Sequence, residues 1–151
     1  MKARLNIAEA QPAAMKAMLH LENSVRGLGL EPSLYELIKI RASQVNGCAY
    51  CIDMHTKDAR AAGETEQRIY GLDAWRETPY YSDRERAALA LAESITLITQ
   101  GHVPDAVFQE AKKHFDEKEL AAAIMACVAI NAWNRIAITS RTEAGTYQPR
   151  H

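Results

Sequence analysis

Two cysteines and a histidine are spaced along the chain like residues that share one face of a helix. Cys48 and Cys51 are three residues apart, and His55 follows Cys51 after four. Side chains three and four positions apart on an α-helix are neighbours, so these three residues form one stripe. Glu36 precedes Cys48 by twelve residues, and an Asn-Gly break between them lets its segment fold back over that stripe. We expect the two sulfurs to share one exposed edge of the helix.

These residue types suit the chemistry of a reactive thiol. The thiolate is the nucleophile, and a free cysteine with a pKa of about 8.5 is only ~3% ionised at pH 7. The free N–H groups at a helix N-terminus favour the thiolate, and His55 can take the proton or stabilise the anion. Glu36 has the opposite direct effect on a thiolate, so its useful role is to accept a proton or to orient His55.

The second thiol makes the oxidation reversible. One sulfur can attack the O–O bond of a peroxide and become a sulfenic acid, and the other then displaces water and closes a disulfide. An external dithiol must reopen that disulfide. The pattern therefore predicts a Cys48–Cys51 dithiol/disulfide cycle that reduces hydroperoxides, with a proton relay through Glu36 and His55.

Two other interpretations use the same four residues. Cys48, Cys51, His55 and Glu36 are all plausible zinc ligands, although structural zinc sites commonly place C-x-x-C in a loop and the chain has no second cysteine pair. Alternatively, a non-enzymatic, oligomeric redox sensor could use the disulfide as a switch, and the sequence does not separate it from an enzyme. Of these, we favour the enzyme, and we predict no bound metal and no cofactor.

The segments that position these residues read as helix almost throughout, because they are rich in Ala, Leu, Glu, Lys, Arg and Met. A thioredoxin-like site would need a strand before the C-x-x-C motif, whereas residues 34–45 have a helical pattern. A Ser-x-x-Glu capping box at Ser82 opens one of the later helices. Expected helices cover residues 12–26, about 33–45, 48–62, 64–70, 83–100, a segment opened by Pro104, and 117–140. We expect residues 71–81 to be irregular and residues 142–151 to be loosely ordered.

The composition is that of a soluble globular protein with one domain over residues 1–151. Of the 151 residues, 48% are hydrophobic and 25% are charged, with no repeat or low-complexity linker. The net charge of -1 gives no basic excess for nucleic-acid binding. The beginning of the sequence has no apolar run long enough for a signal peptide, so we expect a cytoplasmic protein. The longest apolar run, residues 120–130, is too short to span a membrane.

The last long helix predicts a homo-oligomer. It is apolar on most sides as far as Asn131, and a helix that is apolar nearly all round must be covered nearly all round. Asn131, Asn134 and Arg135 interrupt this pattern, and we expect them to satisfy buried carboxylates or to cap subunit contacts. We expect Cys127, in the same apolar run, to be a small core residue.

The full pattern Glu36-x11-Cys48-x2-Cys51-x3-His55 resembles the motif of the alkylhydroperoxidase D-like (AhpD-like) family of the carboxymuconolactone decarboxylase superfamily. The string at residues 41–51, RASQVNGCAYC, and the string at residues 132–135, AWNR, are also similar to that family. The resemblance covers roughly residues 32–138.

This resemblance implies an all-α, AhpD-like helical bundle that forms trimers or hexamers and has peroxidase activity. It implies that Cys51 attacks the peroxide and that Cys48 resolves the sulfenic acid. Tyr50 stands where the best-studied relative has a histidine, and because a phenol is a poor base near neutral pH we expect it to be a wall of the substrate pocket. The implied partners are a hydroperoxide substrate and an external dithiol reductant of the lipoyl type.

Overall fold

α3 is the helix around which the others are arranged. The computed structural model describes residues 2–149, and over these residues the chain forms eight α-helices, one short 3₁₀ helix (η1) and no strand. The elements are α1 (Ile7–Ala10), α2 (Pro12–Arg26), α3 (Pro32–Asn46), α4 (Ala49–Ala61), α5 (Glu66–Gly71), η1 (Leu72–Ala74), α6 (Asp83–Thr96), α7 (Asp105–His114) and α8 (Glu117–Ser140). The all-α fold expected from the sequence is confirmed.

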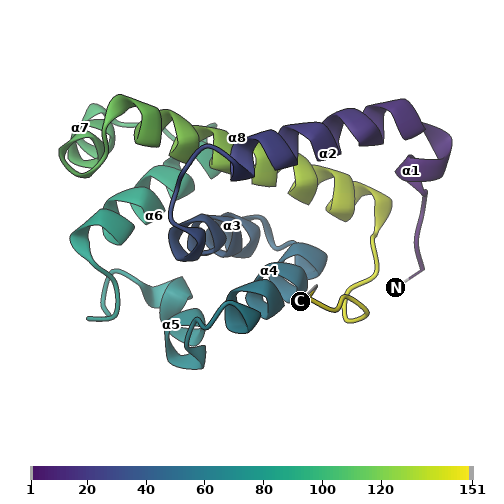
Figure 1. Cartoon of the computed structure of the whole chain (residues 1–151), viewed down its shortest axis with the longest axis horizontal. Helices are drawn as coiled ribbons and strands as arrows, with labels where there is room; N and C mark the ends of the chain where they lie inside the picture. The colour runs from purple at the N-terminus through teal and green to yellow at the C-terminus, as the bar shows by residue number, and fades with distance from the viewer. Residues whose placement is uncertain (1, 150–151) are drawn as a thin grey trace.

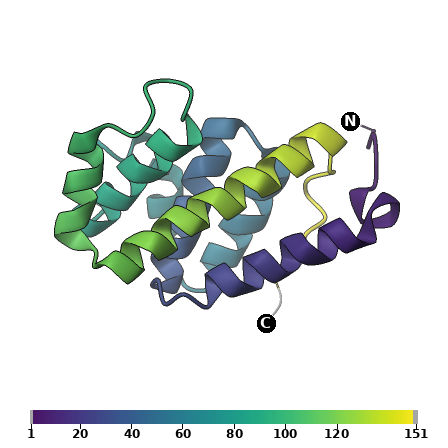
Figure 2. The same ribbon diagram turned by 90° about the horizontal axis from the view of Figure 1, so that it is seen from above.

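α3 packs against α4, α6 and α8, and Figure 1 shows it near the middle of the molecule, with α8 on one side and α4 on the other. Seen from above, α8 runs across the molecule and α2 lies alongside it (Figure 2). The buried residues of α3 include apolar side chains such as Ile38 and two charged ones, Glu36 and Lys39. Charged residues are seldom buried without partners, so α3 supplies polar groups to the interior as well as part of the apolar core.

The turn between α3 and α4 follows from one glycine. Gly47 has φ 68°, in the left-handed region that favours glycine, and it ends α3. The N–H of Cys48 donates to the carbonyl of Ser43 at 2.9 Å, which is the hydrogen bond of a Schellman cap. Cys48 then serves as the N-cap of α4, so that helix begins one residue later than predicted. The chain therefore folds into an α3–α4 hairpin at the predicted Asn-Gly break.

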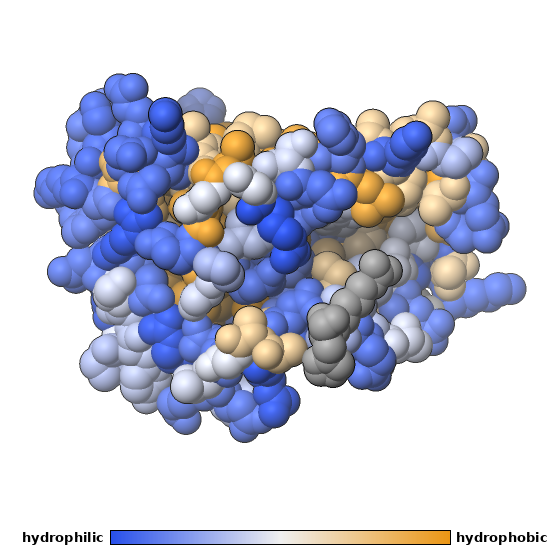
Figure 3. Space-filling model, viewed as in Figure 1, coloured by the Kyte–Doolittle hydropathy of each residue, from blue (hydrophilic) through white to orange (hydrophobic). Residues whose placement is uncertain are grey.

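α8 is fixed at its start by a capping box, in which Asp116 accepts from the N–H of Glu119 at 2.8 Å. It runs for 24 residues, and among the described residues it is the one helix long and apolar enough to cross a membrane. Half of its most apolar 18-residue stretch is buried within the molecule, and the core helix of a soluble protein can be equally long and apolar. Val128 and Ile138 on α8 are nevertheless exposed, and Figure 3 shows apolar atoms along the edge where α8 and α2 run.

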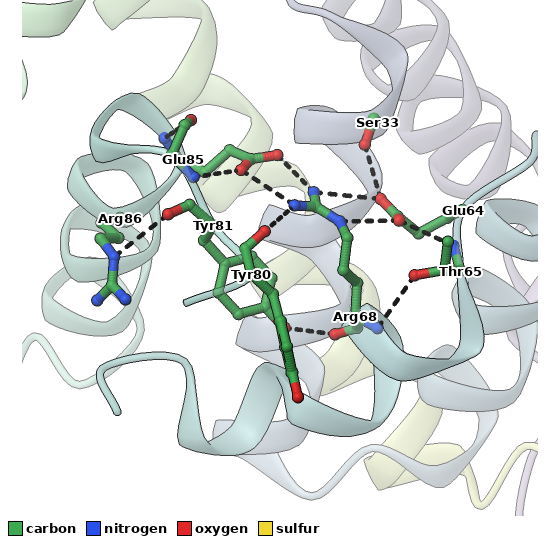
Figure 4. A network of polar contacts seen from close by, with 9 residues as sticks. Ser33, Glu64, Thr65, Arg68, Tyr80, Tyr81, Glu85 and Arg86 are labelled. Atoms are coloured by element: carbon green, nitrogen blue, oxygen red, sulfur yellow. Dashed lines mark hydrogen bonds and ion pairs between the residues drawn. The ribbon is translucent and has the colours of Figure 1, made fainter. Parts of the chain in front are cut away.

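A network of polar contacts joins the start of α3, α5 and the start of α6 (Figure 4). The guanidinium of Arg68 donates to Glu64 at 2.9 Å and to Glu85 at 2.5 Å. Ser33 donates its hydroxyl to the same Glu64 at 2.9 Å, and Glu85 also closes the predicted capping box with Ser82. These contacts fix the end of α3 that lies away from the two cysteines.

Besides the start of α4, other elements differ from the sequence-based expectation. The four-residue α1 was not predicted, because one capping asparagine, Asn6, precedes too few residues to show a helical period. α6 ends at Thr96 rather than at residue 100, since the chain enters a turn at Leu97. α5 covers Glu66–Gly71 rather than 64–70.

The C-terminal segment has no regular structure but is attached to α4. The Nζ of Lys57 donates to the carbonyl of Tyr147 at 3.0 Å, and the hydroxyl of Tyr147 donates to Asp58 at 2.7 Å. The N–H of Gly145 donates to Asp53 at 3.1 Å. The expectation of loose order is therefore wrong for this segment up to residue 149, and residues 150–151 lie outside the described residues.

Candidate active site

The α3–α4 hairpin brings the four predicted residues together. His55 donates from Nδ1 to Oε2 of Glu36 at 2.8 Å, and the Sγ atoms of Cys48 and Cys51 are 2.8 Å apart. Both cysteines are free thiols. Two sulfurs this close need only a small movement to reach the disulfide length of about 2.05 Å.

The sulfurs are buried rather than at an exposed helix edge, which corrects the expectation from spacing. Cys48 is 0% exposed and Cys51 is 2% exposed. The cause is α8, whose Ile130 and Ala137 pack with the two cysteines in one apolar cluster. The sequence spacing placed the thiols on one helix face but could not show that another helix covers that face.

The two thiols differ in their access to a cavity of about 690 Å³. Cys51, His55 and Tyr50 line this cavity, whereas Cys48 does not. The remaining walls are mostly apolar and come from the N-terminal segment, α2, α4 and α8, including Ile7, Met15, Leu19, Met54, Trp133 and Ile136. A small organic molecule entering the cavity would therefore meet the sulfur of Cys51.

The thiols also differ in acidity. The hydrogen bond from the Cys51 thiol lowers the pKa of Cys48 to about 7 against the effect of burial, with help from the backbone N–H groups of Cys51 and Tyr50 and from the Asn134 amide. The same hydrogen bond, together with burial and the neighbouring negative charge, raises the pKa of Cys51. The pair therefore loses one proton near neutral pH, and the charge then rests mainly on Cys48.

Glu36 orients the imidazole of His55. A carboxylate can only accept a hydrogen bond, so the bond to Glu36 places the ring proton of neutral His55 on Nδ1 and leaves Nε2 as an acceptor. Nε2 is the one buried side-chain nitrogen or oxygen without a hydrogen-bond partner among residues 2–149. His55 is 1% exposed and lines the cavity, so its free nitrogen is available to a proton donor there.

A second buried charged pair borders the same cavity, and the sequence analysis did not identify it. The ammonium of Lys39 contacts Oε1 of Glu22, which also accepts from the Tyr35 hydroxyl at 2.8 Å. The indole N–H of Trp133 donates to Oε2 of Glu22 at 3.1 Å. Lys39 is 1% exposed. Its position three residues after Glu36, between the apolar residues Ile38 and Ile40, is the signal that could have revealed it.

These neighbours also determine the acidity of the Glu22–Lys39 pair. Burial alone would raise the pKa of Glu22, but the charge and hydrogen bond of Lys39 and the donors Tyr35 and Trp133 hold it below its usual value. Burial lowers the pKa of Lys39, and Glu22 opposes that shift. The two charges therefore stabilise each other in the interior.

The polar residues of α8 form an amide network behind the thiols instead of satisfying carboxylates. Asn46 donates to the side-chain oxygens of Asn131 at 3.0 Å and Asn134 at 2.8 Å. Asn134 donates to the Ser43 hydroxyl at 3.0 Å, and Arg135 donates to Asn131 at 2.9 Å. The expected carboxylate partners are therefore wrong, and these residues instead connect α8 to the end of α3.

Cys127 takes no part in the site. It is fully buried in the main apolar cluster, and burial raises its pKa to about 12. The thiol is therefore protonated and shielded at neutral pH, as expected for a core residue.

The zinc interpretation is weakened by the geometry. Among the described residues, the donor atoms that group closely enough to share a metal ion come from Glu36, His55 and Asp58, all within 4.8 Å of one another. Neither cysteine belongs to this group. Glu36 is already bonded to His55, and Asp58 accepts from Tyr147. The two thiolates, the imidazole and the carboxylate of the zinc alternative are not grouped as the ligands of a tetrahedral site among the described residues.

Comparison with known proteins gives a consistent result. Residues 12–94 match the sequence model described as "Carboxymuconolactone decarboxylase family". The chain is 46% identical over 146 residues to the uncharacterized protein YdfG of Bacillus subtilis, covering 97% of this chain and 99% of that protein. A shorter region of 57 residues is 39% identical to the alkyl hydroperoxide reductase AhpD of Acidobacterium capsulatum, covering 38% of this chain and 31% of that protein.

A solved structure shows the same fold over nearly the whole chain. A protein of unknown function from Agrobacterium tumefaciens, provisionally named as an AhpD antioxidant defence protein, superposes with a TM-score of 0.94. It is 43% identical in sequence, and the alignment covers 97% of this chain and 100% of that structure.

Proposed function

Because the chain belongs to the carboxymuconolactone decarboxylase family as an AhpD-like member, we propose that it is a thiol-dependent peroxidase that reduces organic hydroperoxides. The observation that carries this proposal is the pair of free thiols 2.8 Å apart, one of which lines a cavity together with a histidine. The name of the Acidobacterium relative, alkyl hydroperoxide reductase, supports the same class of substrate.

In the first step, the Cys51 thiolate attacks the outer oxygen of the hydroperoxide. The O–O bond breaks, the S–O bond forms, and the leaving alkoxide takes one proton to become the alcohol. Cys51 is thereby oxidised to a sulfenic acid. We assign the attack to Cys51 because it lines the cavity and Cys48 does not.

The proton relay follows from the free nitrogen of His55. When the pair is singly ionised, Cys51 retains its proton and donates it toward Cys48. The Cys51 thiolate forms when its proton moves to Cys48 or to Nε2 of His55, and the resulting imidazolium is stabilised by Glu36. The same imidazolium can then give its proton to the leaving alkoxide.

In the second step, the Cys48 sulfur attacks the sulfenic sulfur of Cys51, hydroxide leaves as water, and the disulfide closes. The lowered pKa of Cys48 keeps this resolving thiol ionised near neutral pH. In the third step, an external dithiol of the lipoyl type exchanges with the disulfide, which returns both cysteines to thiols and leaves the reductant oxidised.

The cavity supports an organic rather than a very small substrate. Its volume of about 690 Å³ lies in the range of small-molecule pockets, and its apolar walls would hold an alkyl or aryl group while the peroxide reaches Cys51. Tyr50, which lies next to Cys51 in the chain, is proposed as one wall of this pocket.

We also propose that residues 1–151 form one cytoplasmic domain that assembles into a homo-oligomer, such as a trimer or hexamer. Exposed apolar side chains on α2 and α8 support the homo-oligomer. Leu19 on α2 and Val128 and Ile138 on α8 are each more than 40% exposed. A partner subunit would cover this side of α8, whose other faces are buried. Sedimentation velocity tests this proposal, and a monomer at micromolar concentration would contradict it.

The direct test counts thiols after reduced protein is mixed with cumene hydroperoxide. Wild type and Cys127→Ser should each lose two thiols per chain, whereas Cys51→Ser should lose none at a comparable rate. Equal loss in wild type and Cys51→Ser would refute the mechanism. Sustained consumption of peroxide with dihydrolipoamide distinguishes an enzyme from a redox sensor, which would stop after one oxidation. About one zinc per purified chain would instead favour the metal alternative.

A further inference from the structure

We propose that Lys39, held in place by Glu22, is a positioning residue whose buried ammonium stabilises the negative charge that forms on Cys51. The proposal concerns the thiol itself and holds whether or not the chain reduces peroxides. It assigns a purpose to a charged pair that the fold alone does not require.

The register of the α3–α4 hairpin places Lys39 beside Cys51. Glu36 of α3 meets His55 of α4, and the chain turns at Gly47. Lys39 lies one turn from Glu36 toward the Gly47 turn, and Cys51 lies one turn from His55 in the same direction. Lys39 and Cys51 are therefore the next facing pair of the hairpin, and both line the cavity.

The surroundings of Lys39 fix its ammonium in position. Nζ contacts the carboxylate of Glu22 and lies 4.4 Å from the centre of the Tyr35 ring. Tyr35 of α3 and Trp133 of α8 also donate to Glu22, at 2.8 Å and 3.1 Å, so side chains of two helices hold this carboxylate of α2. A buried ammonium is strongly disfavoured unless it is paired, and an apolar side chain would fill the same space without a partner. A purely structural role therefore does not explain a lysine here.

The charged and titratable groups around this site come from three helices and from the C-terminal segment. α2 contributes Glu22 and Arg26, and α3 contributes Tyr35, Glu36 and Lys39. Cys48 caps α4, α4 contributes Tyr50, Cys51, His55 and Asp58, and the C-terminal segment contributes Glu143 and Tyr147. Arg26 lies 3.7 Å from Glu22 and 3.8 Å from Glu36, so it bridges the two carboxylates. The carboxylates in this set outnumber the cations, so the position of each cation matters for a negative charge on Cys51.

Lys39 is the cavity-lining cation of α3, the helix that faces Cys51 in the α3–α4 hairpin. Its electrostatic attraction lowers the pKa of Cys51, although the hydrogen bond to Cys48 and burial have larger effects in the other direction. The ammonium thus offsets part of the penalty for forming a thiolate at the cysteine that faces the cavity. At Cys48, the backbone N–H groups at the N-terminus of α4 stabilise the thiolate and lower its pKa.

The experiment isolates Cys51 in a chain that carries Cys48→Ser and Cys127→Ser. The rate of alkylation by iodoacetamide is measured against pH, and its midpoint reports the ionisation of Cys51. Adding Lys39→Met should raise this midpoint by about one pH unit, whereas Lys39→Arg should keep it near the parent value. Lys113→Met, which removes an equally positive but remote and exposed side chain on α7, should leave it unchanged.

An unchanged midpoint in a folded Lys39→Met variant would overturn the proposal, as would an equal shift in Lys113→Met. If Lys39→Met alone unfolds because Glu22 loses its cation, the double variant Glu22→Gln with Lys39→Met removes both charges. Its midpoint should still rise, but by less than about one pH unit, because the negative charge of Glu22 is removed as well. Because alkylation requires no peroxide, its result is independent of the peroxidase test. If the alkylation midpoint shifts but peroxide causes no thiol loss, the role of Lys39 holds and the peroxidase function does not, and the opposite pair of results has the opposite meaning.

Discussion

The acidity of the thiol pair gives a quantitative prediction of pH dependence. With the pKa of Cys48 lowered to about 7, about half of the reduced chains carry one thiolate at pH 7 and about a tenth at pH 6. An unperturbed pair would instead hold only a few per cent thiolate at pH 7. The rate of peroxide-driven thiol loss should therefore fall about fivefold from pH 7 to pH 6 and change less than threefold from pH 7 to pH 9.

The assay is single-turnover oxidation by cumene hydroperoxide over pH 5.5 to 9, about the range in which the thiolate forms, followed in parallel by the ultraviolet absorbance of the thiolate. Cys48→Ser is the matched perturbation, because it keeps a hydroxyl at the N-cap but removes the sulfur that carries the charge. This variant should lose the thiolate signal near pH 7. A wild-type midpoint at about pH 8.5 or above, the value of a free cysteine, would refute the reasoning.

The same shifts predict how the stability of the reduced protein depends on pH. Cys48 has a lowered pKa, so between about pH 7 and its unfolded value the folded chain holds fewer protons than the unfolded chain, and stability increases with pH. Cys51 has a raised pKa, so above the unfolded value the folded chain holds more protons and stability decreases. The melting temperature of wild type relative to the Cys48→Ser, Cys51→Ser double variant should therefore be highest near pH 8.5. If the difference in melting temperature between the two proteins does not vary with pH, the pKa shifts of Cys48 and Cys51 are contradicted.

Three further perturbations test separate parts of the site. Glu36→Gln keeps a hydrogen-bond acceptor for His55 but removes the charge, and it should slow peroxide-driven thiol loss about 100-fold in stopped-flow measurements. A decrease in this rate of less than threefold would exclude the proton relay through Glu36. Met15→Trp should narrow the cavity and slow reduction of cumene hydroperoxide about tenfold while leaving hydrogen peroxide unaffected; equal effects on both substrates would place the reaction elsewhere. Asn134→Ala should lower the free energy of unfolding by about 2 kcal/mol in urea titrations, because it removes the donor to the buried Ser43 hydroxyl and one acceptor of the partly buried Asn46 amide; a change below about 0.5 kcal/mol would mean that the network is not needed for stability.

The residues that the sequence predicted are those whose contacts are fixed by local spacing. Cys48, Cys51 and His55 follow from the period of one helix, and Glu36 follows from a break that glycine imposes on the backbone. The all-α fold could be predicted for the same reason, since helix signals such as the Ser82 capping box are local. The boundary errors at α4 and α6 lie where a cap or turn residue decides the end of a helix.

The parts that could not be predicted depend on packing between distant segments. Glu22 meets Lys39 only because α2 lies beside α8 and over the end of the cavity, and no spacing rule connects residues on separate helices. The burial of both sulfurs depends on α8, which follows them by some 70 residues in the chain. Likewise, carboxylates and subunit contacts are the partners expected for the amides of α8, because the sequence does not show that Asn46 and Ser43 lie beside them.

The arrangement of the two thiols explains why the site needs more than a C-x-x-C motif. The N-terminus of α4 stabilises charge on Cys48, which lies behind the cavity wall, whereas the substrate would meet Cys51. A helix N-terminus alone would therefore activate the sulfur that does not face the peroxide. Activating Cys51 requires groups on its own side of the hairpin, and α3 supplies them one turn apart: Glu36 acts through His55, and Lys39 acts through its charge. On this reasoning, loss of either group should impair ionisation or attack at Cys51 while leaving Cys48 acidic.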